Sequence, residues 1–469
     1  MSAERLAVCG GIVVTPEGMR EADVLIEGET VEAVEPAAER HPGRRVLDAA
    51  GCVVLPGAVD AHVHVSIPYV RLDGLVVWSV DRFPEASIAA ALGGTTTIVD
   101  FAMQGEGQDL LAPLEERVAF VAESTVDVAL HCWVVDPADR ALAQLSELVA
   151  RGVPSIKVFM AYSQLGQPMS DGELYDLFEA VGAAGGLVQV HAENAGLNAR
   201  RIEQARSSGR RGYEHFPASR PAVGEEEAVC RALLLARAAG TPVYFVHLST
   251  GAAVRRVAEA RAEGHVVFSE TCPHFLHFDE GRYRSARAGD YLMAPPLRPP
   301  ADREALWRAL AAGEVDVVAT DHAAWPRAAK NYGEGFLEAI QGVAGLGLLL
   351  PLLAASDLGW ETIARVTAES PARIFGLHPR KGVLQAGSDA DVVVLDPRAA
   401  APVPEVPPAW SVDNCIYTGL PAIYPRLVLR RGTVLAEDGR YVGPASGTGV
   451  FVPGSPVGAE TRELGFRVG

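Results

Sequence analysis

The chain has 469 residues and carries 41 basic against 59 acidic side chains, which gives a net charge of −18. Such an acidic surface repels phosphate backbones, so nucleic acid is not expected as a partner. The most apolar run, residues 342–355, is too short and too interrupted by Gly and Pro to span a bilayer, so no membrane partner is expected either.

Along the first fifty residues, apolar and polar positions alternate as in short strands joined by turns. These strands are expected at residues 6–14, 22–28 and 30–36. A similar pattern covers residues 381–397 and 427–443. We therefore predict a small β-sandwich-like domain formed from residues 1–52 and 376–445. Residues 446–469 are expected to form a C-terminal arm or tail, which either docks on a neighbouring subunit or stays disordered.

Residues 53–375 alternate apolar strand-like runs with helical segments about eight times. Helices are expected at residues 112–125, 171–185, 225–240 and 252–264. Repeated strand-helix units predict a parallel sheet covered by helices on its outer face. The expected fold is thus α/β, a (β/α)8 TIM-type barrel with the small β domain beside it.

The run VDAHVHV places Asp60, His62 and His64 at every second position. Alternate side chains of a strand point to the same face, so two imidazoles one step apart can reach the same metal ion. The alternative is a pair of hydrogen-bonded core histidines, and it is the weaker one for Asp-x-His-x-His after a hydrophobic run.

Other strand-like runs of the central unit also hold titratable residues: one run carries Lys157, and others end in His191, His247 and Asp321. In a barrel enzyme the carboxyl ends of the strands form the mouth, where the active site lies. Convergence of several strands on such residues argues against a purely structural role. Four imidazoles and a carboxylate exceed the needs of one tetrahedral ion, so two divalent ions are expected, with zinc as the default.

Lys157 is unusual in this set because an ammonium would be repelled by two dications. It could point away as a structural lysine, act as a Schiff-base amine, or carry CO2 as a carbamate. A carbamate converts the cation into a bridging anion, and the surrounding histidines favour that alternative. The residues alone leave all three open.

Together these residues resemble the amidohydrolase superfamily, and most closely its dihydropyrimidinase and D-hydantoinase group of cyclic amidases. Further matching stretches are GGTTTIVDFA (93–102), FSETCPHFLHFDE (268–280), MAPPLR (293–298) and GSDADVVVLDP (387–397). The resemblance runs from about residue 48 to about residue 445, and its motifs are specific as a set.

The resemblance implies that His62 and His64 bind one metal with Asp321, and that His191 and His247 bind the second. Lys157, carboxylated, would bridge both together with a hydroxide that attacks a ring amide carbon of a hydantoin or dihydropyrimidine. The product would be an N-carbamoyl amino acid or a similar ring-opened acid.

The resemblance also assigns supporting roles. Asp321 would carry the proton to the leaving nitrogen, and Tyr162 would polarise the oxyanion. Asp60 would orient a ligand from behind. A homo-oligomer, tetramer or dimer, is implied as well.

Three departures from the group concern the substrate. The loop after His64 is long and apolar, so Tyr69 and Trp78 are expected to contact a hydrophobic substituent or, alternatively, another subunit. Ala294 stands where dihydropyrimidinases usually have serine. The segment after Asp321 lacks the group's Pro-Asn-Gly-Gly, and Asn331 is a candidate replacement for the missing substrate-binding asparagine.

Single residues argue against two related activities of the superfamily. Ser66 stands where dihydroorotases carry an arginine, which argues against dihydroorotate, and Tyr162 argues against an allantoinase. A specialised cyclic amidase, a Schiff-base lyase using Lys157 and a non-catalytic assembly protein of the same fold remain alternatives. The six cysteines are scattered without a Cys-x-x-Cys pair, which indicates reduced thiols and a cytoplasmic location.

Overall fold

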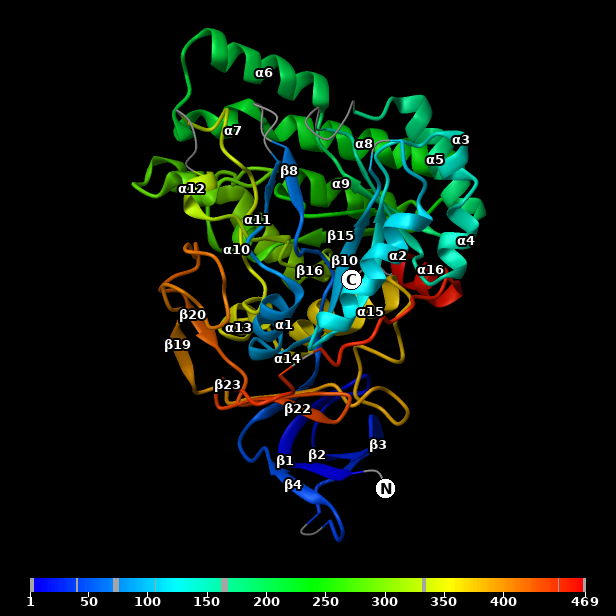
Figure 1. The fold of residues 1–469 in the computed structure, drawn as a ribbon, viewed down its shortest axis with the longest axis vertical. Helices are drawn as coiled ribbons and strands as arrows, with labels where there is room; N and C mark the ends of the chain where they lie inside the picture. The colour runs from blue at the N-terminus through cyan, green and yellow to red at the C-terminus, as the bar shows by residue number, and fades with distance from the viewer. Residues whose placement is uncertain are drawn as a thin grey trace.

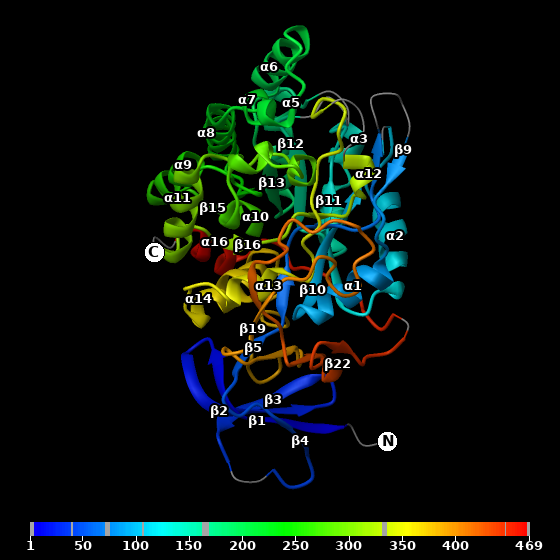
Figure 2. The same cartoon turned by 90° about the vertical axis from the view of Figure 1, so that its left-hand side faces the viewer.

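The structure is a computed structural model in which a barrel and a sheet formed by both ends of the chain lie one above the other (Figure 1). It describes residues 4–38, 41–70, 76–105, 107–161, 168–330, 335–445 and 447–466. The second view, turned by a quarter, shows the same division, with the terminal sheet at the opposite end from helix α6 (Figure 2).

The barrel consists of parallel strands in the order β16-β15-β14-β13-β12-β11-β10-β6. Their bounds are β6 Ala58–Asp60, β10 Thr95–Met103, β11 Asp127–Trp133, β12 Ser155–Phe159, β13 Leu187–His191, β14 Val243–Phe245, β15 Val267–Thr271 and β16 Val317–Val318. The ring is completed by β7 (Val63–His64) and β17 (His322–Ala323), which continue the first and last strands and pair in parallel. This arrangement confirms the predicted (β/α)8 barrel.

Helices follow the strands and cover the outside of the barrel (Figure 2). The longer ones are α1 Phe83–Leu92, α2 Leu111–Phe120, α5 Asp171–Ala183, α6 Ala195–Ser207, α8 Ala222–Ala239, α9 Gly251–Ala262 and α11 Pro300–Ala311. The shorter ones are α3 Asp139–Leu142, α4 Leu145–Ala150, α7 Phe216–Ser219, α10 Pro273–His277, α12 Arg327–Lys330, α13 Leu349–Ala354, α14 Trp360–Ala364, α15 Ser370–Ile374 and α16 Ala459–Phe466. The four predicted helical segments correspond to α2, α5, α8 and α9.

Local chemistry explains where these helices begin and end. Helix α5 starts with a capping box, in which the Ser170 hydroxyl accepts from the Glu173 N–H and the Glu173 carboxylate accepts from the Ser170 N–H. Helix α8 stops at Gly240, whose φ of 67° is left-handed and costs a glycine little.

Within the described ranges, the terminal sheet has nine strands drawn from both ends of the chain. They are β1 Arg5–Thr15, β2 Gly18–Glu27, β3 Thr30–Pro36, β4 Arg45–Asp48, β5 Val53–Pro56, β18 Val392–Leu395, β21 Leu427–Arg430, β22 Thr433–Glu437 and β23 Arg440–Tyr441. Antiparallel pairing of β5 with β18 joins the two halves. Residues 53–56, expected to open the barrel, therefore belong to this sheet. The barrel begins after Gly57, whose N–H donates to the Asp391 carbonyl.

In the described part of the chain, two further antiparallel strand pairs lie outside these sheets. Strands β8 (Pro68–Val70) and β9 (Val76–Trp78) form one of them, and β19 (Ala400–Pro402) and β20 (Pro421–Ile423) form the other. The first belongs to the long apolar loop after His64, and it places part of that loop beside the mouth of the barrel.

The described part of the C-terminal arm lies on its own chain. Backbone N–H groups of Gly454, Ser455 and Val457 donate to the carbonyls of Gly152, Gly376 and Gly185 at 2.8, 3.0 and 2.9 Å. Gly152 and Gly185 precede the barrel strands β12 and β13. The arm thus crosses the amino ends of the strands, on the side away from the mouth, and the expectation of a disordered tail does not apply to it.

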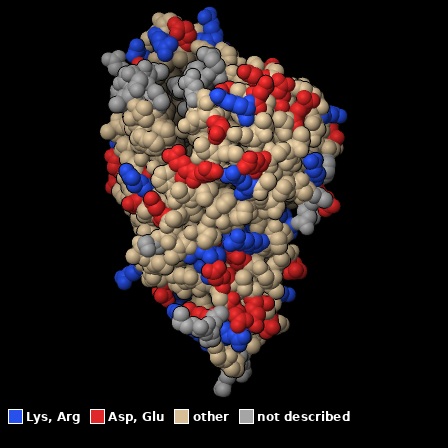
Figure 3. Space-filling view, turned by 45° about the vertical axis from the view of Figure 1, so that its right-hand side comes forward, with Lys and Arg blue, Asp and Glu red and all other residues tan. Residues whose placement is uncertain are grey.

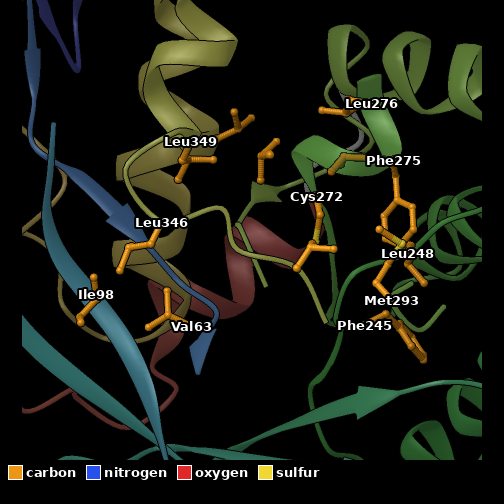
Figure 4. Packing of buried hydrophobic residues seen from close by; sticks show 14 of the residues in the cluster. Val63, Ile98, Phe245, Leu248, Cys272, Phe275, Leu276, Met293, Leu346 and Leu349 are labelled. Carbon is orange, nitrogen blue, oxygen red and sulfur yellow. The ribbon is translucent and has the colours of Figure 1, made fainter. Parts of the chain in front are cut away.

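The main hydrophobic cluster lies between the barrel strands and the surrounding helices. Figure 4 shows Val63 of β7 and Ile98 of β10 on one side of it, with Leu346 close to both. Val63 separates His62 from His64, and it is fully buried. Its burial anchors the strand that presents these two histidines.

The surface agrees with the acidic composition. On the face shown in Figure 3, basic and acidic side chains are interspersed, and the blue residues there do not join into a continuous band. Among the described residues, none of the helices has the length and apolar character needed to cross a membrane.

A buried ionic cluster joins the barrel to the terminal sheet. The Lys381 ammonium lies 2.6, 2.9 and 2.8 Å from carboxylates of Asp127, Asp389 and Asp391. Although burial opposes the charge of Lys381, these carboxylates raise its pKa to about 12. The ammonium is therefore charged in the folded protein and, together with Arg430 and Arg431, offsets the charge of these carboxylates.

Replacing Lys381 with methionine is expected to lower the free energy of unfolding by about 3–5 kcal/mol, because it takes the cation from the buried Asp391 carboxylate, whereas Asp127 keeps Arg430 and Arg431. Equilibrium unfolding in urea, followed by tryptophan fluorescence, measures this loss. The matched control is Arg398→Met, which removes an ion pair with Asp396 in which the arginine is 76% exposed. The control is expected to cost at most about 1 kcal/mol, and an equally small cost for Lys381→Met would contradict the proposed role of the cluster.

Candidate active site

His62, His64 and Asp321 converge at the mouth of the barrel. The Nε2 atoms of His62 and His64 lie 3.4 and 3.3 Å from the same Asp321 oxygen, Oδ1. The ligand atoms of the three residues all lie within 4.8 Å of one another, close enough to share one ion. The period-two reading of VDAHVHV is thus matched by the geometry of the two histidines.

His191 and His247 form a second pair. His191 ends β13 and His247 follows β14, and Nδ1 of the first lies 3.0 Å from Nε2 of the second. The two pairs are neighbours, because the rings of His62 and His247 stack with their centroids 5.5 Å apart.

Lys157 lies in the same pocket, in the middle of β12. Its side chain is fully buried, and its Nζ has no hydrogen-bond partner among the described residues. Burial lowers the pKa of Lys157 to about 7, although Glu270 and Asp321 act in the opposite direction. A buried amine without a partner, beside two pairs of imidazoles, is the feature that a carboxylated lysine and bound metals would account for.

Carboxylates behind the histidines set which ring nitrogen is free for a metal. Glu270 accepts from Nδ1 of His62 at 2.8 Å, which leaves Nε2 facing Asp321. Glu193 accepts from Nε2 of His191 at 2.8 Å, which leaves Nδ1 facing His247. Such carboxylate–histidine pairs orient metal ligands and make them better donors.

The sequence analysis did not single out Glu270 or Glu193. Glu270 lies near the end of β15, so it carries the same signal as the other strand-end residues. Glu193 follows His191 by two positions, on the same side of an extended backbone. Glu270 is held by further donors, the Tyr244 hydroxyl at 2.8 Å and the His247 N–H at 2.9 Å.

Asp60 lies behind Asp321 rather than in the cluster itself. Its carboxylate accepts from the N–H and the hydroxyl of Thr320, at 3.0 and 2.7 Å. Because Thr320 immediately precedes Asp321, this pair of bonds fixes the backbone from which the Asp321 side chain projects.

The protonation states suit metal binding. Burial, together with nearby Lys157 or His191, holds the pKa values of His62 and His247 well below the ordinary value. Burial acts to raise the pKa of Asp321, but the surrounding imidazoles hold it well below its usual range. Neutral imidazoles and an ionised carboxylate are the forms that bind divalent metals.

Two of these residues have strained backbones. His247 and Asp321 have φ angles of 39° and 47°, in the left-handed region that residues other than glycine adopt uncommonly. Such strain concentrates at functional sites and persists only where the surroundings enforce it. The bonds from Glu270 to the His247 N–H and from Asp60 to Thr320 supply that enforcement.

One pocket contains all six proposed ligands, and its remaining walls are largely aromatic and apolar. It encloses about 840 Å³, open solvent at its mouth included. The other lining residues are Ile67, Pro68, Tyr69, Trp133, Phe159, Ala294, Ala323, Trp325, Gln341 and Gly342. Trp325 Nε1 and Gln341 Oε1 are buried atoms without a hydrogen-bond partner in the described part of the chain.

Some of the residues predicted to bind the substrate line this pocket and others do not. Tyr69 and Ala294 line it, as expected. Trp78 does not: it is 57% exposed on β9, because Val77, its neighbour in the strand, takes the inward position instead. Tyr162 and Asn331 lie outside the described residues. Gln341, which the sequence analysis did not consider, contributes a carboxamide to the pocket.

Comparison with known proteins identifies the family. The model of the amidohydrolase family matches residues 53–422. The chain belongs to the amidohydrolase family. It is 35% identical to the D-hydantoinase of Streptomyces coelicolor over 96% of this chain and 98% of the relative. It is 33% identical to the dihydropyrimidinase of Rattus norvegicus over 97% and 89% of the two chains.

A crystal structure of a D-hydantoinase matches this amidohydrolase with a TM-score of 0.92 at 30% identity, covering 97% of this chain and all of the other. Within the family, the chain therefore belongs to the hydantoinase and dihydropyrimidinase group, which confirms the resemblance. The family generally depends on two metal ions, and the donors present here, four imidazoles, Asp321 and the unpartnered amine of Lys157, fit that requirement.

Proposed function

We propose that this protein hydrolyses a ring C–N bond of a hydantoin or dihydropyrimidine, producing an N-carbamoyl amino acid or a similar ring-opened acid. The observation that carries the proposal is the single pocket in which His62, His64, Lys157, His191, His247 and Asp321 meet. The names of the relatives, D-hydantoinase and dihydropyrimidinase, support the same class of substrate.

The proposed metal ligands are divided between two sites. His62, His64 and Asp321 would hold one ion, His191 and His247 the other, and a carbamate on Lys157 would bridge them. Imidazole and carboxylate donors suit zinc. The lowered pKa of Lys157 supports the bridge, because only the neutral amine reacts with CO2, forming the N–C bond of the carbamate and releasing one proton.

Bound in this way, the two ions would supply Lewis acidity and make a water molecule acidic near neutral pH. Asp321 is ionised, and its Oδ1 lies within 3.4 Å of the Nε2 atoms of both His62 and His64. It can therefore accept the proton of the attacking water. The same carboxyl then donates this proton to the ring nitrogen as the C–N bond breaks. Tyr162 is proposed to donate a hydrogen bond to the oxygen of the attacked carbonyl.

The rest of the pocket would select the ring substituent. Tyr69 and Trp325 meet edge to face, with ring centroids 5.9 Å apart, and Trp133 and Phe159 lie 4.6 Å apart. These aromatic walls suit a bulky apolar substituent. The unpartnered Trp325 Nε1 and Gln341 Oε1 would then contact polar atoms of the substrate.

A ring-opening assay on the metal-replete protein tests this function. The panel comprises dihydrouracil, hydantoin, 5-phenylhydantoin, allantoin, dihydroorotate and glutarimide. We expect hydantoins or dihydrouracil to open, with 5-phenylhydantoin faster than hydantoin because of the aromatic walls. His191→Ala is the negative control. If only allantoin or dihydroorotate opens, or if His191→Ala is as active as the wild type, the proposal is wrong.

We also propose that the protein is a homo-oligomer in the cytoplasm. Helix α8 exposes two apolar side chains, Val223 at 60% and Leu234 at 69%, which a neighbouring subunit would cover. All six cysteines are free, as expected in a reducing compartment. Light scattering measures the mass in solution, and a value equal to one chain would exclude the oligomer.

A further inference from the structure

The lysines of this chain are few, and all of them are buried. Three lysines occur among 41 basic residues, so the basic side chains on the surface are arginines. Lys157 belongs to the active site and Lys381 to the ionic cluster below the barrel. Lys330, at the end of helix α12, is the third, and neither the metal site nor that cluster accounts for it.

Lys330 connects two separate walls of the substrate pocket. Its Nζ donates to the carbonyl of Leu292 at 2.8 Å and to the carbonyl of Gly342. Leu292 lies two residues before Ala294, and Gly342 follows Gln341. Ala294, Gln341 and Gly342 all line the pocket. The amine thus ties the segment that carries Ala294 to the segment that carries Gln341.

Among the described residues, no carboxylate takes the place of these carbonyls as the partner of Lys330. Asp290 is the nearby acidic residue, and its carboxylate is engaged by the Arg327 guanidinium, 3.1 Å away. Lys330 is fully buried, and burial lowers its pKa to about 7 although Asp290 acts in the opposite direction. A buried amine that donates to main-chain oxygens constrains those oxygens in either protonation state, since moving one of them leaves buried polar groups without a hydrogen bond.

Other contacts also hold the Leu292–Ala294 segment and the Gln341–Gly342 segment in place. The Gly342 N–H donates to the same Leu292 carbonyl at 2.9 Å. Met293, between Leu292 and Ala294, packs in the hydrophobic core with Leu248 and Phe275 (Figure 4). On the other side, Gly342 has a φ of 127°, and a Cβ there would lie 2.8 Å from Trp325 Nε1. The segment that carries Gly342 is therefore closely packed, and the bonds from Lys330 fix its position relative to Leu292.

We propose that Lys330 is a positioning residue for the substrate, which sets the separation between the Ala294 wall and the Gln341–Gly342 wall of the pocket. The inference rests on the proposed cyclic amidase function, because it assigns these walls to substrate binding. Arginine could not take the same place. Its larger planar guanidinium carries five N–H donors, whereas the buried space offers two carbonyl acceptors to one compact amine.

The test compares Lys330→Met with Lys381→Met on hydantoin and 5-phenylhydantoin. Both variants remove a buried lysine amine, but Lys381 lies at the end of the barrel away from the mouth. For Lys330→Met, we expect KM to rise about tenfold, kcat to stay within about threefold, and the ratio of the two substrates to change, because a misplaced wall affects binding first. Lys381→Met should lose stability while keeping the KM and the ratio of the wild type.

The outcomes separate the two proposals. If the wild type opens no substrate of the panel, the proposed function fails. If the wild type is active and Lys330→Met keeps its KM and its substrate ratio, Lys330 is only structural and the inference is overturned. Should Lys330→Met not fold, Lys330→Arg is measured instead, because the larger guanidinium is expected to displace the two walls. A KM and a substrate ratio equal to those of the wild type in Lys330→Arg would overturn the inference as well.

Discussion

Replacing Asp321 with asparagine is expected to lower kcat by about 10³ or more while the protein stays folded. The change removes the only proposed carrier of the proton between water and the leaving nitrogen, and general acid–base catalysis alone contributes about 10²–10⁴. It also weakens the ion held with His62 and His64, since an amide oxygen is neutral. The measurement is kcat on the best substrate of the panel, together with metal content by mass spectrometry.

Asparagine is the substitution that isolates this chemistry. The φ of 47° at Asp321 lies in the left-handed region, which asparagine tolerates as well as aspartate does. Alanine would add backbone strain to the loss of the carboxylate. The bonds from Asp60 to Thr320 remain in place, so the backbone before position 321 keeps its geometry.

Asp357→Asn serves as the control, because Asp357 is exposed and is not one of the residues that line the pocket. Its activity should equal that of the wild type. A kcat for Asp321→Asn within tenfold of the wild type, with both ions retained, would mean that another group carries the proton.

Much of this site could be predicted because its signal is local. Period two in VDAHVHV places His62 and His64 on one face, and strand ends of a parallel barrel always meet at one mouth. A titratable residue at a strand end is therefore informative without any knowledge of long-range contacts. His191, His247 and Asp321 were found in this way, and Glu270 could have been. Lys157 lies in the middle of its strand and was added because its run belongs to the same set.

What could not be predicted depends on contacts between distant segments. The direction of Trp78 is set by which face of a three-residue strand packs on Trp325 and Ile340, and the composition of β9 is apolar on both faces. Gln341 and Lys330 lie in the long connection after β17, where no periodicity fixes the orientation of a side chain. The placement of β5 in the terminal sheet follows from its pairing with β18, more than three hundred residues later.

Replacing Lys157 with alanine is the second change with a large expected effect. If its carbamate bridges two ions, the variant loses the bridge and at least one ion, and kcat falls by about 10³ or more, since metal ions supply several kcal/mol of transition-state stabilisation. If Lys157 were a Schiff-base amine, activity would also fall, but the metal content would not. Metal analysis of the purified variant therefore distinguishes the two roles that the residues alone left open.

Chemical rescue makes the distinction stronger. Alanine at position 157 leaves a buried space next to His191 and His247, and a small monocarboxylate can place its oxygens there. Adding acetate, propionate or butyrate together with zinc is expected to restore part of the activity and the second ion, because a carboxylate replaces the anion that the carbamate supplied. Methylamine and ethylamine are the matched control, since they restore an amine without the anion. Rescue by the amines and not by the acids would show that the amine itself is the functional group and that the bridge does not exist. Rescue by the acids would account for the unpartnered Nζ of Lys157: burial keeps this amine neutral enough to take up CO2, and only the product of that reaction has the charge that two neighbouring cations require.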